Sequence, residues 1–198
     1  IYPEGSETVL ADEYDGMPFS RPNDLILARN GGVYFTDPGL TQGQAAALVE
    51  RNGGTPLGPR LPAAVYYIPP GEAPARIEDA MIRPNGIQLN RDETTLYISD
   101  SNGAHIIAWD IRADGLVENR REFGILLGRS TRNNGLGGVP SYGDGMTVDN
   151  DDRLYVATGG GVEVLNATGE HLGIIPVRCP PNDCQNLAFA GPARQTLY

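Results

Sequence analysis

The chain repeats one short sequence plan four times. In each unit an Asn or Asp leads a short apolar run, a polar turn follows, and a second run with strand alternation carries a Tyr. The leading residues are Asn23, Asn85, Asp144 and Asn186, and the matching aromatic residues are Tyr34, Tyr97, Tyr155 and Tyr198. An apolar run, a turn and an alternating run are typical of two paired strands, so each unit is predicted to be a β-hairpin.

The spacing of the units predicts a β-propeller. Their leading residues are 62, 59 and 42 positions apart, and each interval has room for about four short strands, as in a propeller blade. The 26 Gly and 16 Pro are scattered along the chain, which suits an all-β protein with many turns. We therefore expect residues 1–198 to form a single all-β domain of the propeller type.

Charge and hydropathy exclude several classes of partner. The formal net charge is −10, so the basic surface of a nucleic-acid-binding protein is missing. No apolar run approaches the ~20 residues that cross a bilayer. We expect a soluble protein with no nucleic-acid and no membrane partner, while the compartment and the oligomeric state stay open.

Few side chains are available for catalysis. All 15 basic residues are Arg, which excludes Schiff-base chemistry by a Lys of this chain. His105 falls in a strand-like run and His171 in a turn-like one, and the motifs of serine hydrolases, zinc proteases and nucleotide-binding loops are absent from the sequence. Carboxylates, carboxamides and backbone oxygens remain, and these are the ligands of a hard cation such as Ca²⁺.

The four leading residues are the candidate cation ligands. The innermost strand of a propeller blade lines the central channel, so a residue where that strand begins points toward the axis. Asn23, Asn85, Asp144 and Asn186 share this position, and Asp37 is a further possible channel-lining residue. Alternatively, these side chains only satisfy backbone amides at the turns. That role does not require similar residues at the same phase of every unit, which favours a cation site.

The sequence also predicts local structure in three other segments. Residues 8–10 are predicted to form a strand and residues 13–19 a loop. Residues 39–62 form a long irregular insertion with a possible helical turn at 45–50, which is either a specificity loop or a plain surface excursion. Cys179 and Cys184 are close enough in sequence to close a small disulfide loop in an exported protein, and two free thiols fit equally well.

The repeated motifs also resemble a known family. Arg21-Pro22-Asn23-Asp24, Arg83-Pro84-Asn85-Gly86, Gly143-Asp144-Gly145-Met146 and the run from Asn186 to Gly191 are similar to motifs of the gluconolactonase, regucalcin and senescence-marker-protein family. The resemblance implies a six-bladed propeller with one divalent cation at the end of the channel, usually Ca²⁺ and sometimes Zn²⁺ or Mn²⁺. It also implies hydrolysis of a sugar lactone.

Roles for individual residues follow from this resemblance. It implies that Asn85 is a metal ligand and that Asp144 is both a ligand and the general base. Asn23 would bind the metal or the substrate, and Arg21 would contact the substrate unless it forms a salt bridge at the rim. Two rival functions stay open. One is phosphotriester hydrolysis at the same site, and the other is binding of a ligand or protein by a non-catalytic propeller with a structural cation.

One departure from the family affects the expected activity. Members of the family are longer and carry a metal-binding Glu in the first blade, to which no residue here can be matched. We therefore expect this chain to cover about four of six blades, without the N-terminal blades and the C-terminal closing strands. The 198 residues alone are expected to bind Ca²⁺ weakly and to turn over little substrate.

Overall fold

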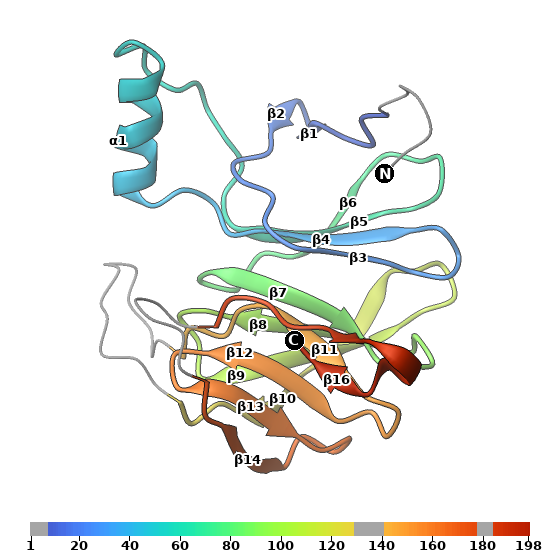
Figure 1. Cartoon of the computed structure of the whole chain (residues 1–198). Helices are drawn as coiled ribbons and strands as arrows, with labels where there is room; N and C mark the ends of the chain where they lie inside the picture. The colour runs from blue at the N-terminus through green and yellow to red at the C-terminus, as the bar shows by residue number, and fades with distance from the viewer. Residues whose placement is uncertain (1–7, 129–140, 178–183) are drawn as a thin grey trace.

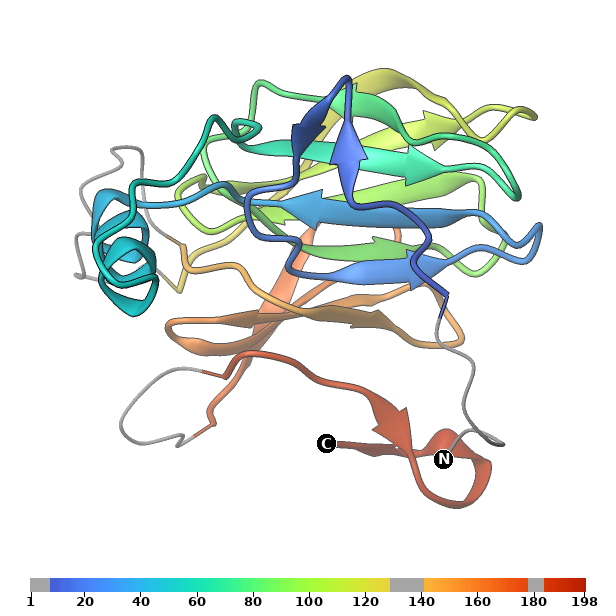
Figure 2. The ribbon, with the colours of Figure 1, turned by 90° about the horizontal axis from the view of Figure 1, so that it is seen from above.

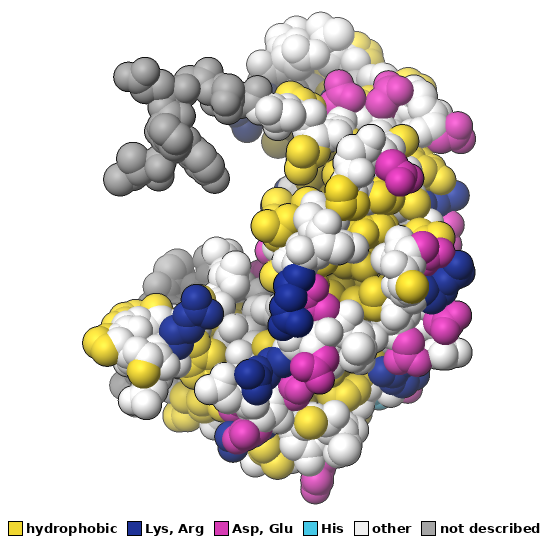
Figure 3. All heavy atoms as spheres, turned by 90° about the vertical axis from the view of Figure 1, so that its right-hand side faces the viewer, with side chains coloured by type: hydrophobic (Ala, Val, Ile, Leu, Met, Phe, Trp, Pro, Cys, Tyr) yellow, Lys and Arg dark blue, Asp and Glu magenta, His cyan; other side chains and the backbone are white. Residues whose placement is uncertain are grey.

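A computed structural model describes residues 8–128, 141–177 and 184–198 of the chain. These residues form three four-stranded antiparallel sheets and two small two-stranded ones. The large sheets lie side by side in an arc around a hollow (Figures 1 and 3). Each follows the chain in order, with every strand paired to the next. The predicted all-β fold is confirmed.

Each predicted repeat begins a sheet. The first large sheet contains β3 (Leu25–Leu27), β4 (Val33–Asp37), β5 (Ala64–Ile68) and β6 (Ala75–Glu78). The second contains β7 (Pro84–Leu89), β8 (Thr95–Asp100), β9 (His105–Ile111) and β10 (Val117–Ile125). The third contains β11 (Met146–Val148), β12 (Leu154–Thr158), β13 (Gly161–Leu165) and β14 (His171–Ile175). The inner strands β3 and β11 both contact β7.

The remaining elements are short, apart from one helix. The chain also forms β1 (Glu13–Tyr14), β2 (Met17–Pro18), β15 (Phe189–Ala190), the 3₁₀ turn η1 (Pro192–Arg194) and β16 (Thr196–Leu197). The helix α1 (Gln42–Arg51) lies at one end of the sheets, and the β3–β4 turn lies at the opposite end (Figures 1 and 2). The predicted hairpins are observed as β3–β4, β7–β8, β11–β12 and β15–β16.

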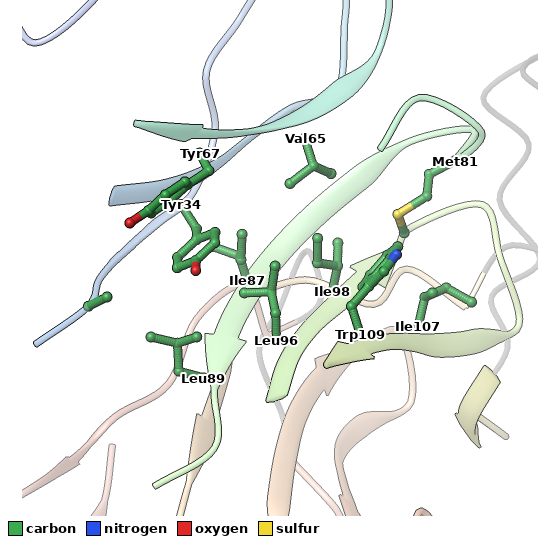
Figure 4. Close-up of a cluster of buried hydrophobic side chains, with 11 residues drawn as sticks. Tyr34, Val65, Tyr67, Met81, Ile87, Leu89, Leu96, Ile98, Ile107 and Trp109 are labelled. Atoms are coloured by element: carbon green, nitrogen blue, oxygen red, sulfur yellow. The ribbon is translucent and has the colours of Figure 1, made fainter. Parts of the chain in front are cut away.

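The second sheet buries both of its faces. Ile87, Leu96 and Ile98 pack against Tyr34 and Tyr67 of the first sheet (Figure 4). On the opposite face, Tyr97 and Ile106 pack in one cluster with Met146, Leu154 and Val156 of the third sheet. This explains why the consecutive residues Leu96, Tyr97 and Ile98 of β8 are all buried, since neighbouring side chains point into two different cores.

Two predictions near the N-terminus are wrong in detail. Residues 8–10 are not in a strand, whereas the segment predicted as a loop contains the hairpin of β1 and β2. Asp15 and Gly16 form its turn with φ values of 53° and 75°. An Asp-Gly pair of positive φ is the favoured two-residue hairpin turn, but strands of two residues leave no alternation that a sequence pattern could reveal.

The predicted helical turn at 45–50 is a longer helix. The Thr41 side chain accepts a hydrogen bond from the Gln44 amide, and the Gln44 side chain accepts one from the Thr41 amide. This capping box satisfies amides that the helix cannot pair internally, and it fixes the start of α1.

His171, predicted in a turn, is the first residue of β14.

Two further predictions concern features beyond strands and turns. In the described ranges, no helix is long and apolar enough to cross a membrane. Cys179 lies outside the described residues, so the question of a Cys179–Cys184 disulfide stays open.

Asp37 and Asp100 hold the backbone that leads into the inner strands. Asp37 ends β4, and its carboxylate accepts hydrogen bonds from the amides of Ser20 (2.6 Å), Arg21 (3.0 Å) and Gly39 (2.9 Å). Asp100 ends β8 and accepts hydrogen bonds in the same way from the amides of Ile82 (2.9 Å), Arg83 (3.0 Å) and Asn102 (2.9 Å). Both carboxylates are buried, so each one is satisfied by the backbone amides that it holds in place.

Replacing Asp37 by Ala should lower the free energy of unfolding by about 3 kcal/mol, because three amides lose their acceptor. Urea denaturation of the variant measures this loss. The matched control is Asp92→Ala in the exposed β7–β8 turn, which should change stability by less than about 0.5 kcal/mol. Equal losses in the two variants would contradict the anchoring role of Asp37.

Candidate functional site

A cavity of about 640 Å³ opens at the α1 end of the sheets. Its wall is mainly polar, and the residues come from the loops that precede the inner strands and from the start of α1. The lining consists of Arg21, Asn23, Asp24, Pro38, Thr41, Gln44, Arg83, Asn85, Ser101, Tyr142, Asp144, Gln185 and Asn186. Such a concave site with convergent polar groups is where ligands usually bind.

The structure brings together five of the six residues predicted for the site. Arg21, Asn23, Asn85, Asp144 and Asn186 all line the cavity. Asp37 is not among the lining residues, because its carboxylate is turned toward the amides of Ser20, Arg21 and Gly39. Its position in the repeat is therefore explained by backbone anchoring.

Glycines allow the leading residues to approach one another. A Cβ on Gly86 would lie 2.0 Å from the backbone oxygen of Asp144, and a Cβ on Gly145 would lie 2.3 Å from the Asn186 side-chain oxygen. Contacts this short do not occur for a real Cβ, so Gly86, which faces backbone, needs to be Gly, whereas a Cβ on Gly145 would displace the Asn186 side chain. Gly86, which follows Asn85, thus lets Asp144 of the next unit come close, and Gly145, which follows Asp144, does the same for Asn186.

In the first unit, a side chain and not a Gly makes the contact with the next inner strand. Asp24 takes the place of the Gly, and its carboxylate accepts hydrogen bonds from the amides of Leu25 (2.9 Å) and Ile87 (3.2 Å). Thr36 reaches the same neighbouring strand, donating from its hydroxyl to the Asn85 backbone oxygen (2.6 Å). Side-chain hydrogen bonds therefore join the first two inner strands at the cavity.

Asn85 is oriented by Ser101. The Asn85 side-chain Nδ2 donates to the Ser101 hydroxyl (2.8 Å), and that hydroxyl donates to the backbone oxygen of Gly143 (3.0 Å). With its nitrogen held in this way, Asn85 directs Oδ1 toward Asn23, whose Nδ2 donates to it. A carboxamide oxygen held in one orientation at a cavity wall is a suitable ligand for a hard cation.

Asp144 has an unusual acidity. The pKa of its carboxyl is raised to about 6, mainly by burial and also by the nearby Asp24 carboxylate, whereas the Gly145 amide, Arg83 and Arg21 oppose the rise. The pKa of Asp24 is also raised, again mainly by burial. Two partly buried carboxylates that resist ionisation are a setting in which a bound cation would be favourable.

The donor set fits a divalent cation that prefers oxygen. Asn23, Asn85 and Asp144 offer carboxamide and carboxylate oxygens at one wall, with Asp24 close by. In the part of the chain that the structure describes, no three His, Cys, Asp or Glu side chains gather as a metal cluster. A cation here would thus depend on neutral carboxamides from this chain for much of its coordination.

Two arginines share the cavity with Asn23, Asn85 and Asp144. Arg21 and Arg83 both line the cavity, and burial together with the charge of Arg21 lowers the pKa of Arg83. Among the described residues, neither guanidinium forms an ion pair or a side-chain hydrogen bond. The rim salt bridge considered for Arg21 is thus not observed in this part of the chain.

Sequence reasoning missed several residues of the cavity. Arg83 was detectable, because it precedes Pro84-Asn85 as Arg21 precedes Pro22-Asn23. Tyr142 gave no pattern, but it adopts a φ of 51°, which is unusual for an aromatic residue and often marks a functional site. The other residues brought to the cavity without a sequence signal are Pro38, Thr41, Gln44 and Gln185.

The family described as SMP-30/Gluconolactonase/LRE-like region matches residues 2–198. The chain belongs to this family. A gluconolactonase of Zymomonas mobilis is 34% identical over 199 residues, which cover 96% of this chain and 51% of that protein. The chain thus spans about half the length of this curated relative.

Solved structures of the family have the same fold. A gluconolactonase from Xanthomonas campestris superposes with a TM-score of 0.72 at 33% identity, over 96% of this chain and 57% of that one. Regucalcin from Agrobacterium tumefaciens, described as a calcium-binding protein, superposes with a TM-score of 0.63 at 20% identity, over 89% of this chain and 51% of that one. The latter likeness shows the shared fold.

Replacing Gly86 by Ala should displace Asp144 from Asn85, because the new Cβ would overlap the Asp144 backbone oxygen. We expect a loss of about 2 kcal/mol or more in unfolding free energy, measured by urea denaturation. Gly43→Ala is the control, since a Cβ there meets open space on α1 and should stabilise the helix by up to about 1 kcal/mol. Unchanged stability of Gly86→Ala would refute this close approach.

Proposed function

We propose that the protein containing this chain hydrolyses a sugar lactone with the help of one divalent cation. The observation that carries the proposal is the convergence of Asn85, Asp144 and Arg21 on one polar cavity. The likeness to a gluconolactonase at 34% identity supports the reaction class. The identity of the lactone is not part of the proposal, because a shared fold does not name a substrate.

Asn85 and Asp144 would hold the cation, and Asn23 would bind the cation or the substrate beside it. Oxygen ligands favour Ca²⁺, and Zn²⁺ or Mn²⁺ are the alternatives. Bound there, the cation would polarise the lactone carbonyl and stabilise the negative charge of the transition state. Ser101 keeps the Asn85 carboxamide in place for this role through its 2.8 Å hydrogen bond.

Asp144 is also the candidate general base. A carboxylate whose pKa is about 6 accepts a proton from water more readily than an ordinary one near neutral pH. Coordination of a cation would weaken this basicity, so the two roles of Asp144 oppose each other. Arg21 would donate hydrogen bonds to a sugar hydroxyl or to the developing oxyanion.

Chelation should abolish lactone hydrolysis by the full-length protein, and added metal should restore it. Hydrolysis of gluconolactone is followed after EDTA treatment and again after addition of Ca²⁺, Zn²⁺ or Mn²⁺. The metal that restores the rate identifies the working cation, and Asp144→Asn should remain folded with little turnover. A folded protein that is inactive with every metal would reject gluconolactone hydrolysis in favour of another substrate class or a binding role.

The acidity of Asp144 predicts how stability changes with pH. Its carboxyl has a pKa of about 6 in the folded protein against an ordinary value of 3.8, so the folded state favours the protonated form. This contribution to stability is fully present below about pH 4 and is lost as the pH rises through about 6. At pH 7.5 the metal-free protein should therefore gain about 2 kcal/mol from Asp144→Asn.

Added Ca²⁺ should reverse the order of thermal stability of the unsubstituted protein and Asp144→Asn. The cation stabilises the ionised carboxylate, so it should raise the melting temperature of the unsubstituted protein more than that of Asp144→Asn. Thermal melts in EDTA and in Ca²⁺ at pH 4 and pH 7.5 measure both effects, with the exposed Asp92→Asn as the control. Equal shifts with Ca²⁺ in all three proteins would exclude Asp144 as a ligand.

A further inference from the structure

We infer that the substrate of this cavity carries an anionic group, a carboxylate or a phosphate ester, and that Arg83 together with Arg21 binds it. The inference rests on the proposed lactone hydrolysis and narrows its substrate class. It starts from the two guanidinium groups that line one wall of the cavity. Arg83 is a specificity-determining residue in this scheme.

The two arginines are placed side by side by the fold. They occupy the same position in successive units, since Asp37 binds the Arg21 amide (3.0 Å) and Asp100 binds the Arg83 amide (3.0 Å). Their like charges repel each other, and Arg83 is partly buried. Bringing two cations together at a cavity wall costs free energy unless an anion compensates them.

The Asp144 carboxylate attracts both guanidinium groups, but among the described residues the acidic side chains of the cavity form no ion pair with them. Asp24 accepts hydrogen bonds from the Leu25 and Ile87 amides, and Asp144 accepts one from Gly145. Within the described residues, neither carboxylate forms an ion pair with Arg21 or Arg83. The guanidinium donors are thus left for a group that enters from solvent.

The choice of side chain also points to an anion. Arg presents a planar set of N–H donors that matches the oxygens of a carboxylate or a phosphate. Neutral sugar hydroxyls need no such charge, and Thr41, Gln44 and Gln185 already offer neutral polar groups in the same cavity. The chain as a whole has a net charge of −10, so two neighbouring arginines without an ion-pair partner among the described residues are a local exception.

Two matched pairs of lactones test the inference on the full-length, metal-loaded protein. Glucono-1,5-lactone is compared with its 6-phosphate, and glucono-1,4-lactone with glucaro-1,4-lactone, each corrected for spontaneous hydrolysis. We expect the anionic member of one pair to exceed its neutral partner about tenfold or more in kcat/KM. The pair that shows the preference tells whether the anion is a phosphate or a carboxylate.

Substitutions assign the preference to Arg83. Arg83→Gln should lower the ratio of anionic to neutral kcat/KM about tenfold, and Arg83→Lys should restore part of it because the charge is kept. Arg112→Gln in the exposed turn between β9 and β10 makes the same charge change and should leave the ratio unaltered. The inference would be overturned if the ratio of anionic to neutral kcat/KM were near or below one in both pairs of lactones. It would also be overturned if Arg83→Gln had the same ratio as the unsubstituted protein.

A binding measurement separates this inference from the proposed reaction. If none of the four lactones is hydrolysed, the lactonase proposal fails. Calorimetry with EDTA-treated protein then decides, using 6-phosphogluconate and glucarate against neutral glucitol. Binding of an anion that is lost in Arg83→Gln supports the inference, and absence of anion binding overturns it.

Discussion

The close approach of neighbouring inner strands is the constraint on which the rest of the structure depends. Gly86 meets the Asp144 backbone at a distance that leaves no room for a side chain, and Gly145 lies against the Asn186 side chain. At the other end of the arc, Asp24 and Thr36 bind across to β7 with hydrogen bonds. This approach brings residues from distant parts of the sequence to one cavity, and it lets the sheets close over the apolar layers between them.

The electrostatics of the cavity differ from those of the whole molecule. At the hairpin end of the sheets, Arg and acidic side chains are interspersed (Figure 3), with ion pairs such as Arg29–Glu93 and Arg153–Asp149. Such exposed pairs add little free energy and mainly balance the surface. In the cavity Asp24, Arg83 and Asp144 are partly buried and form no ion pair among the described residues, so desolvation is the largest cause of the raised pKa of Asp144.

The repeat was sufficient to predict the hairpins, and it gave five of the residues that line the cavity, because a hairpin is local and its turn residues are visible in sequence. The direction of a side chain was not predictable. Asp37 has the repeat position expected of a site residue, yet its carboxylate turns back to amides of the preceding loop. Arg83 could have been found from its repeated Arg-Pro-Asn setting, whereas Thr41 and Gln44 reach the cavity only because of where α1 lies.

The anchoring of Arg21 and Arg83 has a consequence for how specificity can change. Each backbone is held by a carboxylate from the end of the adjacent strand, so its position does not depend on what the guanidinium binds. The side chains at these two positions can therefore be exchanged while the framework of the cavity keeps its shape. Selection or protein engineering could therefore change the charge that the cavity presents to a ligand at two positions whose amides are held by buried carboxylates, with Asn85 and Asp144 left in place.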